Sequence, residues 1–262
     1  MSLLILLFLA FLPTIFWFIV FLHEEKFDPI PKRLITKIFI FGGLSAVVAI
    51  IINLVVILPL PDHIRTTFFN LEKVKTLSLD LAIIVVVLTI LLAFIEEIIK
   101  IFAVKIFAYK DPKFNQVVDG AVLGVSAALG FATLENLFYF FDALEKGVGM
   151  LVVVFVLRFL ATTLLHATAT GISGYFLGKE KFTGEKGVFF KGLFAAMLTH
   201  ATFNLFLLGG LVGIILELVF LVTMFIFLLR RMESVEAQTI WKLIPFRRPY
   251  SSSSLTGSSN RL

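Results

Sequence analysis

Glu96, Glu97 and Lys100 form the motif whose residue types and spacing could most readily do chemistry. They interrupt an apolar run that begins near Asp80 and continues to Phe107. On a helix, Glu96 and Lys100 lie on one face and can pair, whereas Glu97 points about 100° away and needs another partner. Adjacent carboxylates are costly in an apolar segment, and ionisable groups in such segments usually mark a functional site.

Later apolar segments carry further polar residues at helical spacing. Glu135 and Tyr139 share one helical face, and Asn136 lies beside them. His200 and Asn204 are one turn apart, so both can contact the same substrate or ligand. A buried carboxylate without a partner is unfavourable by several kcal/mol, so Glu135 needs a metal, a cation, a histidine or a proton.

A polar stripe also follows one side of an otherwise apolar helix, with a residue at every fourth position: Arg158, Thr162, His166 and Thr170. Arg158 and Asp119 are expected either to pair across the bundle as a structural bridge, the favoured alternative, or to line the entry of the substrate. Small residues between Gly120 and Gly130 predict a face where helices approach closely.

Counting along each helix at about 1.5 Å per residue tests whether these groups can meet. Glu97, His166 and His200 come out at similar depths. Glu135 comes out one or two helical turns further outward. The count therefore permits one site but does not require it.

Two histidines and a glutamate are the ligand set of a hydrolytic zinc site with an open position for water. This interpretation assigns His166, His200 and either Glu135 or Glu97 to a zinc ion, with the remaining glutamate as general base. The sequence contains no His-Glu-x-x-His element, so the common zinc-protease signature is absent.

A metal-free interpretation is equally simple. One of Glu96 and Glu97 would activate water as a general base. His200 and Asn204 would then polarise the carbonyl and stabilise the oxyanion. Both interpretations end in hydrolysis of a peptide bond within the membrane.

The composition explains why these groups must lie in a membrane. Of the 262 residues, 59% are hydrophobic and only 16% are charged, whereas soluble domains average roughly a quarter charged. The sequence predicts an all-α, polytopic membrane helix bundle with about seven (seven or eight) spans. The predicted spans are Leu3–Leu22, Leu34–Leu60, Leu79–Phe107, Val117–Phe141, Met150–Leu177, Val188–Leu208 and Leu211–Leu229.

Lysine and arginine counts predict the orientation. The odd-numbered loops are richer in these residues than the even-numbered loops, which places the N-terminus outside and the C-terminus in the cytoplasm. Residues 1–232 are expected to form the transmembrane domain, and residues 233–262 a basic, Ser-rich tail that is largely disordered. The net charge of +5 lies mostly in loops and tail, which favours contact with membrane lipid over nucleic-acid binding. The absence of cysteine excludes disulfides and thiolate chemistry.

Four motifs in order resemble the PrsW family of intramembrane proteases, which is related to the CAAX-prenyl endopeptidases and the bacteriocin-processing membrane proteases. The motifs are Glu96-Glu97-x2-Lys100, Phe131-x3-Glu135-Asn136-x2-Tyr139, His166, and His200-x3-Asn204.

The resemblance covers about residues 94–205. It implies site-1-type cleavage of a membrane-anchored or single-span substrate, such as an anti-sigma factor, in the plasma membrane of a prokaryote. It implies that Glu96, Glu97, Glu135 and His166 are essential. Lys100, Asn136, Tyr139 and Arg158 are expected to support them. The competing hypothesis is an ion- or proton-coupled transporter that uses the same intramembrane cluster.

Overall fold

The computed structural model is a bundle of helices and describes residues 3–23, 29–69 and 78–243, with side chains to residue 235. Among the described residues there is no strand, and seven helical segments are long and apolar enough to cross a membrane. This confirms the predicted fold class. The helices are α1 (Leu3–Leu22), α2 (Lys32–Ile57), α3 (Asp62–Phe69), α4 (Leu79–Phe107), α5 (Val117–Glu145), α6 (Val148–Leu157), α7 (Thr163–Thr183), α8 (Val188–Leu207) and α9 (Gly210–Leu243).

Two of these helices differ from simple single spans. A π-helical turn, η2 (Arg158–Thr162), joins α6 to α7, so one span runs from Val148 to Thr183. α3 is a short helix in the long connection after the second span, a connection that continues beyond it into residues outside the described ranges. α9 continues past the predicted end of the last span, and the Ser-rich end of the tail lies outside the described residues.

α5 is the centre of the bundle, because 89% of the residues in its most apolar 18-residue stretch are buried inside the protein. α7 packs against one side of it through glycines, since a Cβ added to Gly120 would lie 2.2 Å from the carbonyl oxygen of Gly174. α2 packs against another side, where a Cβ on Gly130 would lie 1.9 Å from the carbonyl oxygen of Phe39. The predicted close approach along the small-residue face of α5 is therefore confirmed.

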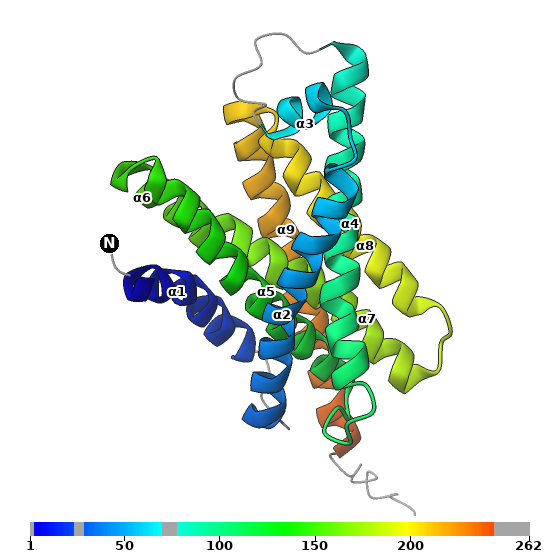
Figure 1. Ribbon diagram of the computed structural model, residues 1–262. Helices are drawn as coiled ribbons and strands as arrows, with labels where there is room; N and C mark the ends of the chain where they lie inside the picture. Colours follow the sequence, from blue (N-terminus) through cyan, green and yellow to red (C-terminus); the bar gives the residue numbers. More distant parts are fainter. Residues whose placement is uncertain (1–2, 24–28, 70–77, 244–262) are drawn as a thin grey trace, which may run out of the picture.

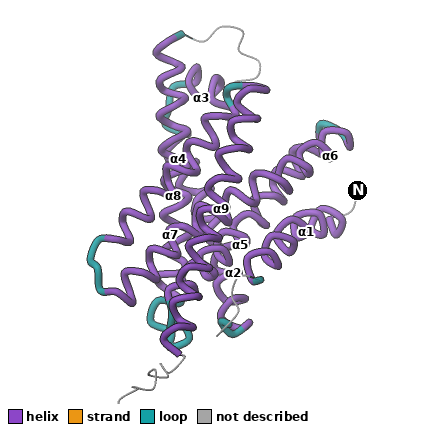
Figure 2. Tube along the Cα trace, turned by 180° about the vertical axis from the view of Figure 1, so that it is seen from behind, coloured by secondary structure: helices purple, strands orange, loops and turns teal. Residues whose placement is uncertain are grey.

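The other helices surround this centre with an apolar exterior. Large apolar side chains are exposed along α1, α2, α4 and α9, as expected for surfaces that contact lipid. α1 and α6 lie side by side at one end of the molecule and diverge from α2 and α4 (Figures 1 and 2). This arrangement brings the middle of α5 close to α4, α7 and α8, which carry the polar motifs.

Candidate active site in the membrane

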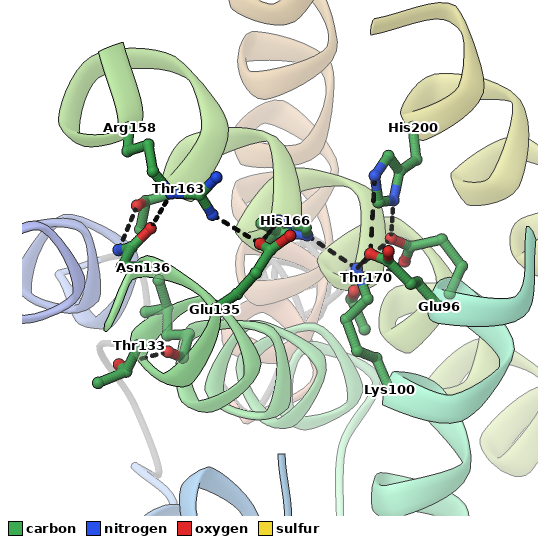
Figure 3. Close-up of polar contacts among 12 residues, drawn as sticks. Glu96, Lys100, Thr133, Glu135, Asn136, Arg158, Thr163, His166, Thr170 and His200 are labelled. Atoms are coloured by element: carbon green, nitrogen blue, oxygen red, sulfur yellow. Dashed lines mark hydrogen bonds and ion pairs between the residues drawn. The ribbon is translucent and has the colours of Figure 1, made fainter. Parts of the chain in front are cut away.

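A fully buried ammonium group, the Nζ of Lys100 on α4, lies at the centre of the polar residues (Figure 3). It donates to Glu97 Oε1 at 2.6 Å and to His166 Nδ1 at 2.8 Å. It also lies 4.6 Å from the centre of the Phe131 ring, a favourable cation–π contact. Lys100 is paired mainly with Glu97 rather than with Glu96, whose Oε2 is 3.9 Å away.

Glu97 is a carboxylate whose oxygens both have partners. Its Oε1 accepts from Lys100 and lies 2.8 Å from His200 Nδ1, and its Oε2 accepts from the hydroxyl of Thr170 at 2.8 Å. The side chain has no exposed surface. Glu97 therefore holds together side chains from α4, α7 and α8.

Glu135 on α5 anchors a second set of contacts. Its Oε2 lies 2.8 Å from His166 Nε2 and accepts from Arg158 at 2.6 Å. Arg158 also donates to the amide oxygen of Asn136, and the guanidinium carbon lies 4.1 Å from the centre of the Tyr139 ring. The structure thus brings Glu135 directly to His166, although depth counting along the helices placed it further outward.

The expected pairing of Arg158 with Asp119 is wrong. Asp119 lies at the start of α5 and accepts from the backbone N–H groups of Asn115 at 2.7 Å and Gln116 at 2.9 Å. There it caps the helix, while Arg158 lies near the other end of α5 beside Glu135.

Glu96 differs from the other two carboxylates because its Oε2 is buried without a hydrogen-bond partner among the described residues. This oxygen lies 3.9 Å from His200 Nε2, which is too long for a hydrogen bond but short enough for one water to contact both atoms. The side chains of Glu96 and Glu135 are 15% and 20% exposed. Glu96 and Glu135 are therefore the partly exposed carboxylates of the cluster, whereas Glu97 has no exposed side-chain surface.

The partners of the two histidines define which ring nitrogen carries hydrogen. An ammonium group can only donate, so His166 Nδ1 accepts from Lys100, and His166 Nε2 donates to Glu135. An ionised carboxylate can only accept, so His200 Nδ1 donates to Glu97. In the neutral form of His200 with this hydrogen on Nδ1, the lone pair is on Nε2, which lies 3.9 Å from Glu96 Oε2.

The donor types fit a zinc ion, but the lone pair of His166 Nδ1 accepts from Lys100 in this structure, so the ammonium group would have to move for this nitrogen to bind the ion. One nitrogen each of His166 and His200 and an oxygen of Glu96 lie within 4.8 Å of one another, and two imidazoles with a carboxylate are a common catalytic zinc set. Each histidine donates its other N–H to a carboxylate, Glu135 or Glu97, which is how metal-binding histidines are usually oriented. The carboxylate that lies with the two histidines in this possible metal site is Glu96, whereas the sequence pattern indicated Glu135 or Glu97.

Two further polar residues complete the description. Asn204 follows His200 by one turn of α8, is half-buried, and makes no hydrogen bond with any residue that the structure describes. Thr163 accepts from the amide nitrogen of Asn136 at 3.2 Å. The sequence pattern did not indicate Thr163, because this residue lies outside the polar stripe that recurs at every fourth position from Arg158.

The fold and site define a multi-pass membrane protein with a buried Glu/His/Lys cluster. A model described as "PrsW family intramembrane metalloprotease" matches residues 30–230. The chain belongs to the PrsW family.

Similar curated proteins bear the name Protease PrsW. The Halalkalibacterium halodurans protein is 36% identical over 122 residues, which are 45% of this chain and 53% of that protein. The Bacillus subtilis protein is 39% identical over 93 residues, 36% of this chain and 39% of that protein. The Clostridioides difficile protein is 24% identical over 209 residues, 76% of this chain and 78% of that protein. The first-named alignment thus spans about half of its relative's length. No solved structure matches the chain.

Proposed function

We propose that this chain is an intramembrane endopeptidase that hydrolyses a peptide bond of a membrane-anchored protein. The observation that carries the proposal is that Glu96 Oε2 has no hydrogen-bond partner in the described part of the chain and lies 3.9 Å from His200 Nε2. Every oxygen of Glu97, by contrast, already has a donor. Glu96 is therefore the carboxylate available to a reacting water.

Different residues of the chain have different roles in the proposed hydrolysis. Glu96 takes a proton from the attacking water as the water oxygen bonds to the scissile carbonyl carbon, and the same proton is passed to the leaving amine as the C–N bond breaks. The amide N–H of Asn204 is free to donate to the developing oxyanion. Lys100 and Arg158 offset the negative charge of Glu97 and Glu135.

A zinc ion would be held by Glu96, His166 and His200. When bound, it would supply Lewis-acid polarisation of water and carbonyl. Glu97 and Glu135 would keep the two imidazoles oriented through His200 Nδ1–H and His166 Nε2–H. If Glu96 bound the ion, Glu135, the other partly exposed carboxylate of the cluster, would take the proton instead.

The proposed setting is the plasma membrane of a prokaryote, with the N-terminus outside and the C-terminus in the cytoplasm. Lysine and arginine in the odd-numbered loops support this orientation. The proposed substrate is a single-span protein cleaved in regulated, site-1-type proteolysis, for which an anti-sigma factor is the example given by the family resemblance.

The test is cleavage of a single-span model substrate by the detergent-purified chain, compared with Glu96→Gln. Loss of a positioned base typically lowers the rate 10²- to 10⁴-fold, so we expect about that loss. Glu145→Gln, at the exposed end of α5, is the matched control and should retain full activity. Wild-type activity in Glu96→Gln, or flux in proteoliposomes without cleavage by any form, would overturn the proposal and favour transport.

Metal content separates the two versions of the mechanism. Elemental mass spectrometry of the wild type and His200→Ala should show about one zinc per chain that the variant loses, if the ion is resident. Cleavage that survives chelators without stoichiometric metal would assign the reaction to Glu96 alone.

A further inference from the structure

The helix that carries Arg158 and His166 contains a π-helical turn, and this turn determines where both side chains point. The N–H of Thr163 bonds to the carbonyl of Arg158, five residues earlier. In a regular α-helix, side chains eight residues apart are offset by about 80°. A π turn takes up one extra residue and removes most of this offset. Both Arg158 and His166 can therefore reach Glu135.

α1 contacts this turn through a single polar group. The indole N–H of Trp17 donates to the carbonyl oxygen of Phe159, inside the π turn, at 2.7 Å. The ring of Phe16, the preceding residue, lies 5.3 Å from the ring of Phe159. A donor from another helix is one of the recognised ways in which an irregular helical turn is stabilised.

The same face of α1 also contacts α5 beside the site. The hydroxyl oxygens of Thr133 and Thr14 lie 3.2 Å apart in a buried contact one turn before Asn136 (Figure 3). Each hydroxyl also lies 2.7 Å from a backbone carbonyl oxygen of its own helix. Asn136 and Glu135 on α5 are the partners of Arg158. α1 therefore contacts both the π turn that carries Arg158 and the α5 segment next to its partners. α1 lies outside residues 30–230, the part matched by the family model.

We propose that α1 is a working part of the active site, with Trp17 as a positioning residue that fixes the π turn and hence Arg158 and Glu135. Because this inference rests on the proposed proteolysis, one of its tests measures cleavage activity. Its structural readout, the stability of the π turn, does not depend on that activity.

Trp17→Phe in the full-length chain tests the proposal, because it removes the N–H donor and keeps an aromatic ring beside Phe225. Hydrogen exchange followed by mass spectrometry should show faster exchange in the peptide covering residues 158–163, with α8 unchanged. Phe8→Leu is the matched control, since Phe8 is an exposed residue of the same helix, and it should leave exchange unchanged. Thr14→Val provides a second variant if Trp17→Phe does not fold.

The kinetic test is a double-mutant cycle with Arg158→Lys. In the wild-type background, Trp17→Phe should lower kcat by about 3- to 10-fold and leave KM unchanged. In the Arg158→Lys background, the same substitution should lower kcat by less than about 2-fold. Unchanged exchange over residues 158–163 would overturn the inference whatever the activity. Additive losses in the cycle would also overturn it, because they would show that Trp17 only stabilises the fold. Absence of cleavage by the wild type would instead count against the proposed function, and the exchange result would still decide the role of α1.

Discussion

Lys100→Met should strongly destabilise this protein, because it leaves a buried carboxylate without its main counter-charge. Lys100 and Glu97 have no exposed side-chain surface and are 2.6 Å apart. Removing one partner of such a pair typically lowers the free energy of unfolding by about 3–5 kcal/mol. At about 2–4 °C per kcal/mol for a chain of this size, the melting temperature should fall by roughly 6–20 °C.

A second variant tests the reason for the loss. In the double variant Glu97→Gln with Lys100→Met, neither charge remains, so much of the lost stability should return. Cleavage should be lost in the double variant, because glutamine no longer provides the carboxylate that orients His200 through its Nδ1–H. The control is Lys146→Met, which removes the exposed i,i+4 pair with Asp142 and should change the free energy of unfolding by less than about 1 kcal/mol.

Thermal unfolding of the wild type, Lys100→Met, Glu97→Gln, the double variant and Lys146→Met in one detergent is the assay. If Lys100→Met melted within about 2 °C of the wild type, the pair would not be the buried charge pair that the structure shows. The charge pair would also be refuted if the double variant lost more free energy of unfolding than the sum of the losses in Lys100→Met and Glu97→Gln.

Three further substitutions probe the contacts around this pair. Thr170→Val removes the donor to Glu97 Oε2 and should lower stability by about 1.5–3 kcal/mol in thermal unfolding, the usual range for a hydrogen bond to a charged group. Gly120→Leu should prevent accumulation of folded protein, measured by size-exclusion chromatography, because a Cβ there would lie 2.2 Å from the carbonyl oxygen of Gly174; the exposed Gly149, with nothing within 4 Å, is the control position. Arg158→Lys keeps the charge but loses the second donor to Asn136, and should lower kcat about 10- to 100-fold in the cleavage assay, as for other groups that orient site residues.

The membrane crossings were predictable because hydropathy measures what a bilayer requires. The predicted span Leu79–Phe107 has the same bounds as α4, since an apolar run of this length is bounded by polar residues at both ends. The end of α7 was predicted too early, at Leu177, because the helix continues beyond the apolar run to Thr183. It ends before Gly184, whose φ of +69° favours glycine. Hydropathy indicates where the chain leaves the hydrocarbon core of the membrane, but a helix can continue beyond that point.

The partners within the site were harder to predict from spacing. Helical periodicity correctly placed Glu96 and Lys100 on neighbouring positions, but Lys100 turns mainly to Glu97. Arg158 could not reach Asp119, because Gly120 packs against Gly174, about 24 Å along the helix from Arg158. Such pairings depend on the register between helices and on a π turn, neither of which a single sequence encodes in its periodicity.

The charges of the site support the proposal that Glu96 is its reactive carboxylate. Three carboxylates, those of Glu96, Glu97 and Glu135, share the site with only two permanent cations, Lys100 and Arg158. Each cation lies within 2.6 Å of a carboxylate oxygen, of Glu97 and of Glu135 respectively. Glu96 is therefore the carboxylate without a cation in hydrogen-bond contact, since its Oε2 lies 3.9 Å from both Lys100 Nζ and His200 Nε2.

This imbalance predicts opposite effects of Glu96→Gln on stability and activity. The variant removes the unpaired charge and provides an amide donor opposite His200 Nε2, so the metal-free protein should melt about 2–8 °C higher, as expected for a gain of about 1–2 kcal/mol. Cleavage should be lost in the same preparation. Zinc should raise the melting temperature of the wild type but not that of the variant, because the ion would no longer find a carboxylate ligand. A Glu96→Gln protein that melts below the metal-free wild type would show that Glu96 stabilises the resting site, and would remove the argument that this carboxylate is kept unpaired for catalysis.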